Sequence, residues 1–392
     1  MLSIYLKRIL LSINSKDISL YIHWPYCLKK CPYCDFNSHA RDNINHLKWL
    51  KAYLNELRYY ANETSERVIS SVFLGGGTPS LMKPSIIEKI LDEIQSLWHC
   101  SKDMEVTAEA NPSSSETQLF KDFRGAGINR LSIGVQSLNN QSLMFLGRLH
   151  NADDARKAIK AATKIFPRIS FDLIYALPGQ TPIAWKKELA SAIKIAGEHL
   201  SLYQLTIEPG TEFHKKRIKV ANEDIGAELY ELTQEIMDAA GLPAYEISNH
   251  AKKGQESRHN LIYWQGGDYL GIGPGAHGRI TNKYKTEMMH NYREPEMWLN
   301  LAITKKYGNQ KRATLSKEER RDELVLMGLR LTEGISLVHF NSLTNQHLTK
   351  IIDKNRINTL ADQGYLTLNG TVLKSTFKGR QRLNAVLKYL LT

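Results

Sequence analysis

Six short apolar runs alternate along this chain with longer stretches in which apolar residues recur at helical spacing, and this alternation constrains the fold more than any other feature. The apolar runs are Ile18–Trp24, Ser71–Gly75, Met104–Ala110, Leu131–Gln136, Ile169–Ala176 and Ser201–Glu208. The helical stretches cover residues 45–62, 83–98, 115–125, 152–165, 183–197 and 223–239. Strict alternation of strand and helix predicts an α/β fold with a parallel sheet and crossover helices, either open or curled into a barrel.

Unusual residues stand at the C-terminal end of every predicted strand. In chain order these groups are Cys27–Cys34, Gly75–Pro79, Glu109–Pro112, Gln136–Ser137, Asp172 and Glu208–Gly210. Parallel α/β folds bind their ligands at the carboxyl ends of the strands. The six ends are therefore predicted to converge on one site.

Three of the four cysteines lie in one short loop after the first predicted strand: Cys27, Cys31 and Cys34. Four cysteines in 392 residues are too few for a disulfide framework, so the cluster of thiols indicates a reducing, cytoplasmic environment and a metal. Three thiolates suit three corners of a 4Fe–4S cluster and leave the fourth iron without a protein ligand. A zinc site would need His23 or His39 as a further ligand, and the paired spacing of a zinc ribbon is absent. Cys100 lies beyond the second predicted helix, where a packing role is expected.

The cysteine spacing C-x3-C-x2-C, with Tyr33 before the last cysteine and the Gly-Gly-Gly-Thr-Pro loop at Gly75–Pro79, resembles the radical S-adenosylmethionine (SAM) superfamily. This resemblance implies a partial (β/α)6 barrel in which the open iron of the cluster binds SAM. Glycines there would let a ligand approach the backbone closely. Acidic side chains and an arginine would bind the polar groups of SAM.

The resemblance extends over nearly the whole chain to the coproporphyrinogen dehydrogenase group and, within it, to the HemW-type heme chaperones. The matching segments are LYIHWPYC, FLGGGTPS, EANP, GVQS, LGRLHN, DLIYALPGQT, YQLTIEPGT, HNLIYW and YLGIGPGAHG. The resemblance implies that the three clustered cysteines ligate the iron–sulfur cluster. It also implies SAM contacts at Tyr21, Tyr33, Gly76, Gly77, Thr78, Glu109, Gln136, Arg148 and Asp172.

Two functions follow from this resemblance, a heme chaperone that passes heme to an acceptor such as a respiratory protein, and an oxygen-independent coproporphyrinogen III dehydrogenase. The dehydrogenases carry a fourth cysteine where this chain has Phe36, and they carry a longer segment before the cluster loop than the 26 residues that precede Cys27. The HNLIYW segment is typical of the chaperones. These differences favour the chaperone. Whether the protein is an enzyme stays open, and no catalytic residue is assigned.

Heme binding requires an axial ligand for the iron and an apolar slot with a basic group near the propionates. His259 and Tyr263 in the HNLIYW segment are predicted to contact heme, with Arg258 beside a propionate. Three other histidines next to motifs are alternatives for the iron: His23, His250 and His277. The competing interpretation gives His259 a hydrogen-bonding role and places Trp264 in the core.

The expected domains are an N-terminal extension at 1–17, a radical SAM barrel with the cluster loop and heme-associated segment at 18–285, and a C-terminal winged-helix-like domain at 286–392. The sequence pattern of residues 286–392 predicts amphipathic helices and a hairpin that turns at Asn369–Gly370. In the resembling family this domain covers the barrel, so no nucleic acid partner is expected.

The charge and hydropathy of the sequence indicate which kinds of partner the protein can bind. The formal net charge of +12 is mostly dispersed along the sequence, which indicates a solvated basic surface. No apolar run reaches the length of a membrane span. A cytoplasmic location is expected, and the N-terminal extension leaves peripheral contact with a membrane open.

Overall fold

A parallel sheet forms the first part of the protein, for which a computed structural model describes residues 16–112 and 116–392. Residues 1–15 of the predicted N-terminal extension lie outside the described residues. The six predicted strands are confirmed as β1 (Asp17–Trp24), β4 (Val68–Gly76), β5 (His99–Ala110), β6 (Arg130–Gln136), β7 (Arg168–Tyr175) and β8 (His199–Gln204). They pair in parallel in this order, for example with Leu20 of β1 opposite Val72 of β4. All six C-terminal ends therefore lie at one edge.

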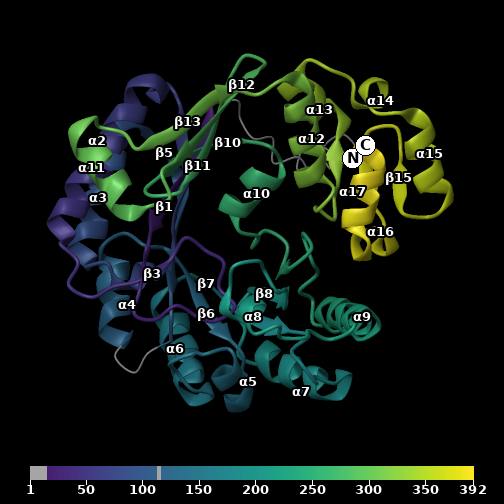
Figure 1. The fold of residues 1–392 in the computed structure, drawn as a ribbon, viewed down its shortest axis with the longest axis horizontal. Coiled ribbons are helices and arrows are strands. Elements are labelled where there is room, and N and C mark those ends of the chain that lie inside the picture. The colour runs from purple at the N-terminus through teal and green to yellow at the C-terminus, as the bar shows by residue number, and fades with distance from the viewer. Residues whose placement is uncertain (1–15, 113–115) are drawn as a thin grey trace.

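Helices cover the outside of this sheet, which is curled into a partial barrel (Figure 1). The six predicted helices are confirmed as α2 (His46–Thr64), α3 (Pro84–Leu97), α4 (Glu116–Gly125), α6 (Ala152–Ile165), α7 (Pro182–Ile193) and α9 (Glu223–Ala239). The strands are apolar on both faces because they are covered on both. Ile18, Leu20 and Ile22 of β1, for example, are fully buried.

Short elements in the loops complete the barrel. They are β2 (Tyr26–Cys27), β3 (His39–Ala40), η1 (Pro79–Leu81), α5 (Asn140–Phe145), α8 (Glu212–Lys215), β9 (Asn249–Ala251) and α10 (Arg258–Trp264). The pair β2–β3 closes the base of the cysteine loop. The predicted sixth strand is shorter than expected, since β8 ends at Gln204 and residues 205–208 form a loop.

The sheet continues beyond the six predicted strands. On one side β10 (Asp268–Ile272) pairs in parallel with β1, and β11 (His277–Asn282), β12 (Lys285–Asn291) and β13 (Asn309–Thr314) follow in antiparallel order. Helix α11 (Pro295–Thr304) packs on α2 and buries Trp298 in the same core as the barrel. The expected domain boundary after residue 285 thus falls inside β12. Short strands of mixed polarity such as NQKRAT carry no apolar run that sequence patterns would detect.

The remaining chain forms a smaller unit with its own hydrophobic core. Its elements are α12 (Lys317–Gly328), β14 (Ile335–Ser336), α13 (Leu337–Thr344), α14 (Leu348–Ile351), α15 (Lys354–Asp362), β15 (Leu366–Leu368), β16 (Val372–Ser375), α16 (Phe377–Gln381) and α17 (Leu383–Leu391). The predicted hairpin is confirmed, and Gly370 takes a φ of +82° in its turn. The amphipathic stretch at 348–363 is split into α14 and α15, because the side chain of Asp353 caps a new helix.

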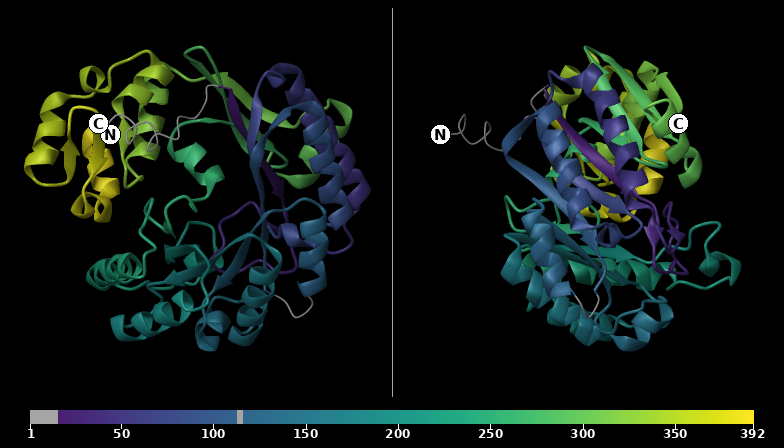
Figure 2. Two further views of the ribbon diagram at one scale, coloured as in Figure 1. Left: turned by 180° about the vertical axis from the view of Figure 1, so that it is seen from behind. Right: turned by 90° about the vertical axis from the view of Figure 1, so that its left-hand side faces the viewer.

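This C-terminal unit closes the open side of the curved sheet (Figures 1 and 2). Helix α12 packs on α10, and Arg279 of β11 donates from Nε to Glu323 of α12 at 2.8 Å. On the other side, the amide of Thr332 donates to the carbonyl of Tyr245 at 3.1 Å. The unit therefore holds both ends of the sheet.

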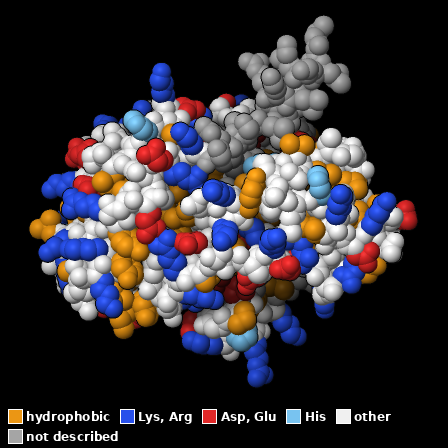
Figure 3. All heavy atoms as spheres, turned by 90° about the horizontal axis from the view of Figure 1, so that it is seen from above, with side chains coloured by type: hydrophobic (Ala, Val, Ile, Leu, Met, Phe, Trp, Pro, Cys, Tyr) orange, Lys and Arg blue, Asp and Glu red, His pale blue; other side chains and the backbone are white. Residues whose placement is uncertain are grey.

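Charged side chains are dispersed over the surface of the protein, as they are along the sequence. Lys and Arg side chains are spread over the face seen in Figure 3, with Asp and Glu between them. Among the described residues, no helix is both long enough and apolar enough to cross a bilayer.

Candidate functional site

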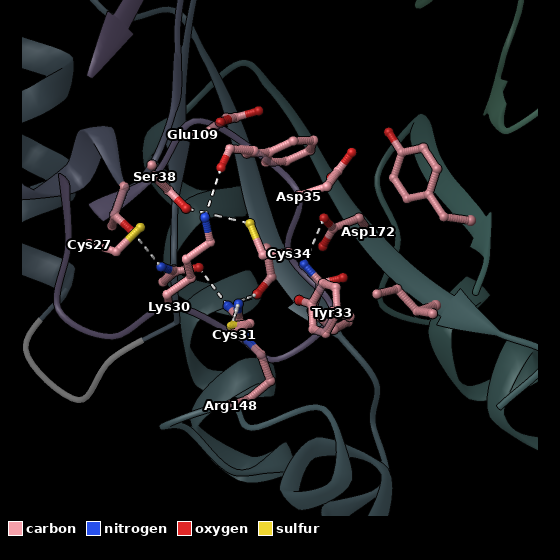
Figure 4. A pocket seen from close by; sticks show the side chains of 18 of the residues that line it. Cys27, Lys30, Cys31, Tyr33, Cys34, Asp35, Ser38, Glu109, Arg148 and Asp172 are labelled. Atoms are coloured by element: carbon pink, nitrogen blue, oxygen red, sulfur yellow. Dashed lines mark hydrogen bonds between the residues drawn. The ribbon is translucent and has the colours of Figure 1, made fainter. Parts of the chain in front are cut away.

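A cavity opens where the six parallel strands end, as the sequence predicts (Figure 4). We call it the first cavity. The three clustered cysteines line it together with eight of the nine residues assigned to SAM: Tyr33, Gly76, Gly77, Thr78, Glu109, Gln136, Arg148 and Asp172. The ninth, Tyr21, lines a neighbouring cavity instead. Cys100 lines neither of these two cavities and is half-buried at the start of β5.

Each cysteine sulfur in the first cavity lies near a hydrogen-bond partner from a different part of the fold. Thr78 Oγ1 lies 3.3 Å from the sulfur of Cys27, and Arg148 Nη1 lies 3.4 Å from that of Cys31. Ser38 Oγ lies 3.6 Å from the sulfur of Cys34. Donors of this kind stabilise thiolates, the form in which cysteine binds metals. The three sulfurs are thus suited to an iron–sulfur cluster.

The two histidines considered as zinc ligands have other partners. The ring of His23 bonds to the hydroxyl of Tyr21 at 3.1 Å and to the carbonyl of Asn37 at 2.9 Å. His39 Nε2 lies 3.2 Å from Asn37 Oδ1. Within residues 16–112 and 116–392, no group of three or more His, Cys, Asp or Glu side chains is arranged to hold a single metal ion, which is a different demand from that of a cluster of four irons.

The glycine loop after β4 packs closely against the end of β1. Gly76 has a φ of +112°, and a Cβ at this position would lie 2.5 Å from the ring of His23. A Cβ on Gly77 would lie 2.6 Å from the carbonyl oxygen of Tyr26. The Gly76 amide donates to Glu109 Oε2 at 3.1 Å, and the Gly77 amide donates to the carbonyl of Trp24 at 2.7 Å. The fold itself therefore requires these glycines, and their amides are already bonded within the protein.

Two partly buried carboxyl groups, those of Glu109 and Asp172, form the acidic part of the first cavity. Burial raises the pKa of Glu109 to about 7; the negative charge of Asp172 also raises it, whereas the Gly76 amide and the charge of Arg130 lower it. Burial likewise raises the pKa of Asp172. Asp172 Oδ2 accepts from Gln136 Nε2 at 3.0 Å, but its Oδ1 is buried without a partner among the described residues. An unpartnered buried acceptor suits a hydroxyl or ammonium group of a bound ligand.

Arg148 lines this cavity as a cation, as do Lys29 and Lys30. Its Nη2 donates to Asn111 Oδ1 at 2.5 Å and to the carbonyl of Gly134 at 2.7 Å, so the guanidinium is held in place beside Cys31. Asn111 and Tyr203 also line the cavity, although sequence reasoning did not assign them. Asn111 follows a predicted strand in the EANP segment, which was a usable signal. Tyr203 had none, because it lies within an apolar run.

A second cavity, of about 520 Å³ against about 330 Å³ for the first, shares a wall with it. The shared residues are Phe36, Gly76 and Glu109. Aromatic and cationic side chains make up much of the remaining lining: Tyr21, His23, Phe73, His259, Tyr263, Tyr269, His277, His290 and Arg293. A larger cavity with aromatic walls suits a flat apolar ligand.

The predicted heme residues His259 and Tyr263 both line the second cavity, but they are bonded to each other. His259 Nε2 lies 2.8 Å from the hydroxyl of Tyr263, and Nδ1 lies 2.9 Å from Ser71 Oγ. The His259 ring stacks on Phe73 at 5.0 Å, and burial lowers its pKa to about 3. Arg258 lines neither cavity. It pairs with Asp103 at 2.6 Å, which does not support the predicted contact with a propionate in the second cavity.

His277 and His290 form a second histidine pair in this cavity. They face each other across β11 and β12, with their rings stacked at 4.1 Å and 18°. The pKa of His277 is lowered to about 4, first by partial burial and then by His290 and the charges of Arg279 and Arg293. His250 is buried on β9 and lines neither cavity.

Comparison with known families and proteins agrees with this geometry. The radical SAM superfamily model matches residues 21–192, and the HemN C-terminal domain model matches residues 315–382. The heme chaperone HemW of Escherichia coli (strain K12) is 35% identical over 382 residues, covering 97% of this chain and 99% of that protein. HemW of Haemophilus influenzae is 37% identical over 387 residues, with coverage of 96% and 98%.

A mitochondrial relative and a solved structure are also similar. The radical S-adenosyl methionine domain-containing protein 1 of Danio rerio is 36% identical over 389 residues, covering 96% of this chain and 88% of the relative. Coproporphyrinogen III oxidase (HemN) from Escherichia coli, described as a radical SAM enzyme, superposes with a TM-score of 0.81. It covers 99% of this chain and 92% of its own at 20% identity, which establishes a shared fold.

Proposed function

Because the chain belongs to the family of the HemW heme chaperones within the radical SAM superfamily, we propose that it binds heme, a 4Fe–4S cluster and SAM and passes the heme to an acceptor protein, such as a respiratory protein. The observation that supports this most directly is the second cavity. It is lined by aromatic rings and histidines and shares a wall with the cavity of the three cysteines. Heme requires this combination of apolar surface and imidazole.

The residues of the first cavity fit the two cofactors that the superfamily implies. Cys27, Cys31 and Cys34 would hold the cluster, and SAM would complete its open iron. When bound, the cluster and SAM supply one-electron chemistry. Around them Glu109 and the unpartnered Asp172 Oδ1 accept hydrogen bonds from cationic or hydroxyl groups, and Arg148 supplies a positive charge.

The second candidate is coproporphyrinogen dehydrogenation, and the fold shared with HemN favours it. One residue, Phe36, helps to distinguish the two candidate functions. It stands where the dehydrogenases have a fourth cysteine, it is 60% exposed, and it lines both cavities. A phenyl ring at this point extends the apolar wall of the second cavity and cannot bind a metal.

One preparation can test both functions. The full chain is reconstituted without oxygen with iron and sulfide, then titrated with hemin and assayed, with SAM and a reductant, for decarboxylation of coproporphyrinogen III. We expect stoichiometric hemin binding and no decarboxylation. Formation of protoporphyrinogen would contradict the chaperone function and establish the dehydrogenase.

The fourth cysteine, Cys100, offers a control for the assignment of the three cluster ligands. Serine in place of Cys27, Cys31 or Cys34 is expected to abolish the visible absorption of the reconstituted cluster, because each change removes one ligand. Cys100→Ser is expected to retain it, since Cys100 lines neither cavity. Loss of iron from the Cys100 variant would show that the cluster ligands are assigned wrongly.

A further inference from the structure

Among the candidate axial ligands, His23, His259 and Tyr263 already make hydrogen bonds within the protein. His259 uses both ring nitrogens, with Ser71 and Tyr263 as partners. His23 also uses both, with Tyr21 and Asn37. Ligation of iron by either ring would first have to break one of these hydrogen bonds and leave its partner unsatisfied. His250 lines neither cavity.

His277 and His290 differ from His23 and His259 in their hydrogen bonds. Both line the second cavity, and neither ring makes a hydrogen bond to another described residue. The rings are the only part of each side chain with a donor atom for iron. Their lone pairs are therefore free at the wall of the cavity.

The rest of the second cavity supplies what a porphyrin needs around such a ligand. Phe36, Phe73 and Tyr269 provide ring faces for the macrocycle. Arg293 is exposed at the cavity and can pair with a propionate. This cation takes the role that the sequence suggested for Arg258.

We propose that the His277–His290 pair, and not His259 or Tyr263, supplies the axial ligand of the heme iron in the second cavity. This inference rests on the proposed function. The two rings stack at 4.1 Å with an interplanar angle of 18°, so they lie face to face with no room for a porphyrin between them. The axial positions of heme iron are on opposite faces of the porphyrin, hence one ring binds the iron and the other packs against it and orients it. A single protein ligand also leaves one face of the heme free for an acceptor.

The test is a hemin titration of the reconstituted full chain, followed by absorption and resonance Raman spectroscopy. The wild-type protein should give a five-coordinate, histidine-ligated heme. The double variant His277→Ala/His290→Ala should bind hemin at least tenfold more weakly with a shifted Soret band, and added imidazole should restore the spectrum. The single variants identify the ligating ring.

His347→Ala serves as the matched control, because it removes an exposed imidazole from the C-terminal unit that lines neither cavity. It should bind hemin like the wild type, with unchanged iron content of the cluster. An unchanged affinity and spectrum in the double variant, or a bis-histidine low-spin spectrum in the wild type, would overturn the assignment and leave the proposed function standing. A wild-type protein that binds no hemin would overturn both.

Discussion

Glu109 combines partial burial, a raised pKa and a place in the wall of both cavities. Its amide partner, Gly76, fixes one oxygen of the carboxyl group. A carboxyl group with a pKa of about 7 is half ionised at neutral pH. Its charge, and so its attraction for a cation, therefore changes across the physiological range.

This titration predicts that SAM binds more tightly as the pH rises from 6 to 8. SAM carries a sulfonium and an ammonium group, which the ionised form of Glu109 favours and the neutral form does not. We expect an affinity gain of up to about tenfold, measured by calorimetry on the reconstituted protein, since the ionised fraction grows by about that factor. In Glu109→Gln the pH dependence should flatten, apart from a contribution of Asp172. A wild-type affinity that falls over this range would show that the neutral form binds.

At the scale of elements, the end of β4 depends on Gly76. Gly76→Ala would place a methyl group against the His23 ring at a φ of +112°. We expect a loss of roughly 2–4 kcal/mol in the free energy of unfolding, from backbone strain and the clash together.

Gly179→Ala is the matched control, because Gly179 also has a positive φ, +74°, but a Cβ there meets no atom within 4 Å. It should cost only about 1 kcal/mol. Denaturant unfolding of both variants measures the difference. Equal losses would mean that the contact with His23 is unimportant.

Helix α2 is tied to the far side of the sheet by one buried carboxylate. Glu56 accepts hydrogen bonds from the amides of Gly273 and Gly308, from Trp298 Nε1 and from Asn291 Nδ2. Burial raises its pKa to about 7, and these four donors oppose that rise. The carboxylate thus joins β10, β12 and α11 to α2.

Glu56→Gln is expected to destabilise the protein by about 1–3 kcal/mol, because its amide group turns a donor toward donors and leaves at least one N–H unsatisfied. Glu63→Gln on the same helix is the control. Glu63 pairs with Arg312 at the surface, where an ion pair contributes about 1 kcal/mol or less. Thermal unfolding of the two variants should separate them clearly.

At the scale of the whole molecule, the two hydrophobic cores are joined through α10 and α12. Arg320 is 5% exposed and donates from Nη2 to the carbonyl of Gly266 at 2.6 Å and from Nη1 to Glu323 at 2.7 Å. Glu323 in turn accepts from Arg279 of β11. This chain of contacts links the C-terminal unit to the wall of the second cavity.

Arg320→Ala should therefore weaken the coupling between the cores. We expect a loss of about 3 kcal/mol, because Glu323 and the Gly266 carbonyl lose a buried charged donor. Calorimetric unfolding should then separate from one transition into two. Arg321→Ala, next to it in α12 and paired with Asp322, should leave a single transition. Two transitions already in the wild type would show that the cores are independent.

The sequence by itself determined the alternating strands and helices of the parallel sheet and the cysteine site. Strand and helix periodicities are local, and each of the six predicted strands and helices is present. The three thiols share one loop, so their proximity needs no tertiary information. The glycine and acidic positions could also be placed together, because parallel strands bring their carboxyl ends to one edge, whereas Arg148 follows α5 and was assigned only from the family resemblance.

Only the tertiary structure decided which side chains are free to bind. The partner of His259 is Ser71, 188 residues away in the chain, and no local pattern reports that contact. His277 meets His290 because β11 and β12 pair in one register, and a shift by one residue would turn the rings apart. Arg258 faces Asp103 and Arg293 faces the cavity for the same reason. The direction of a side chain and the satisfaction of its polar atoms depend on neighbours that are distant in sequence, and these are fixed only when the chain has folded.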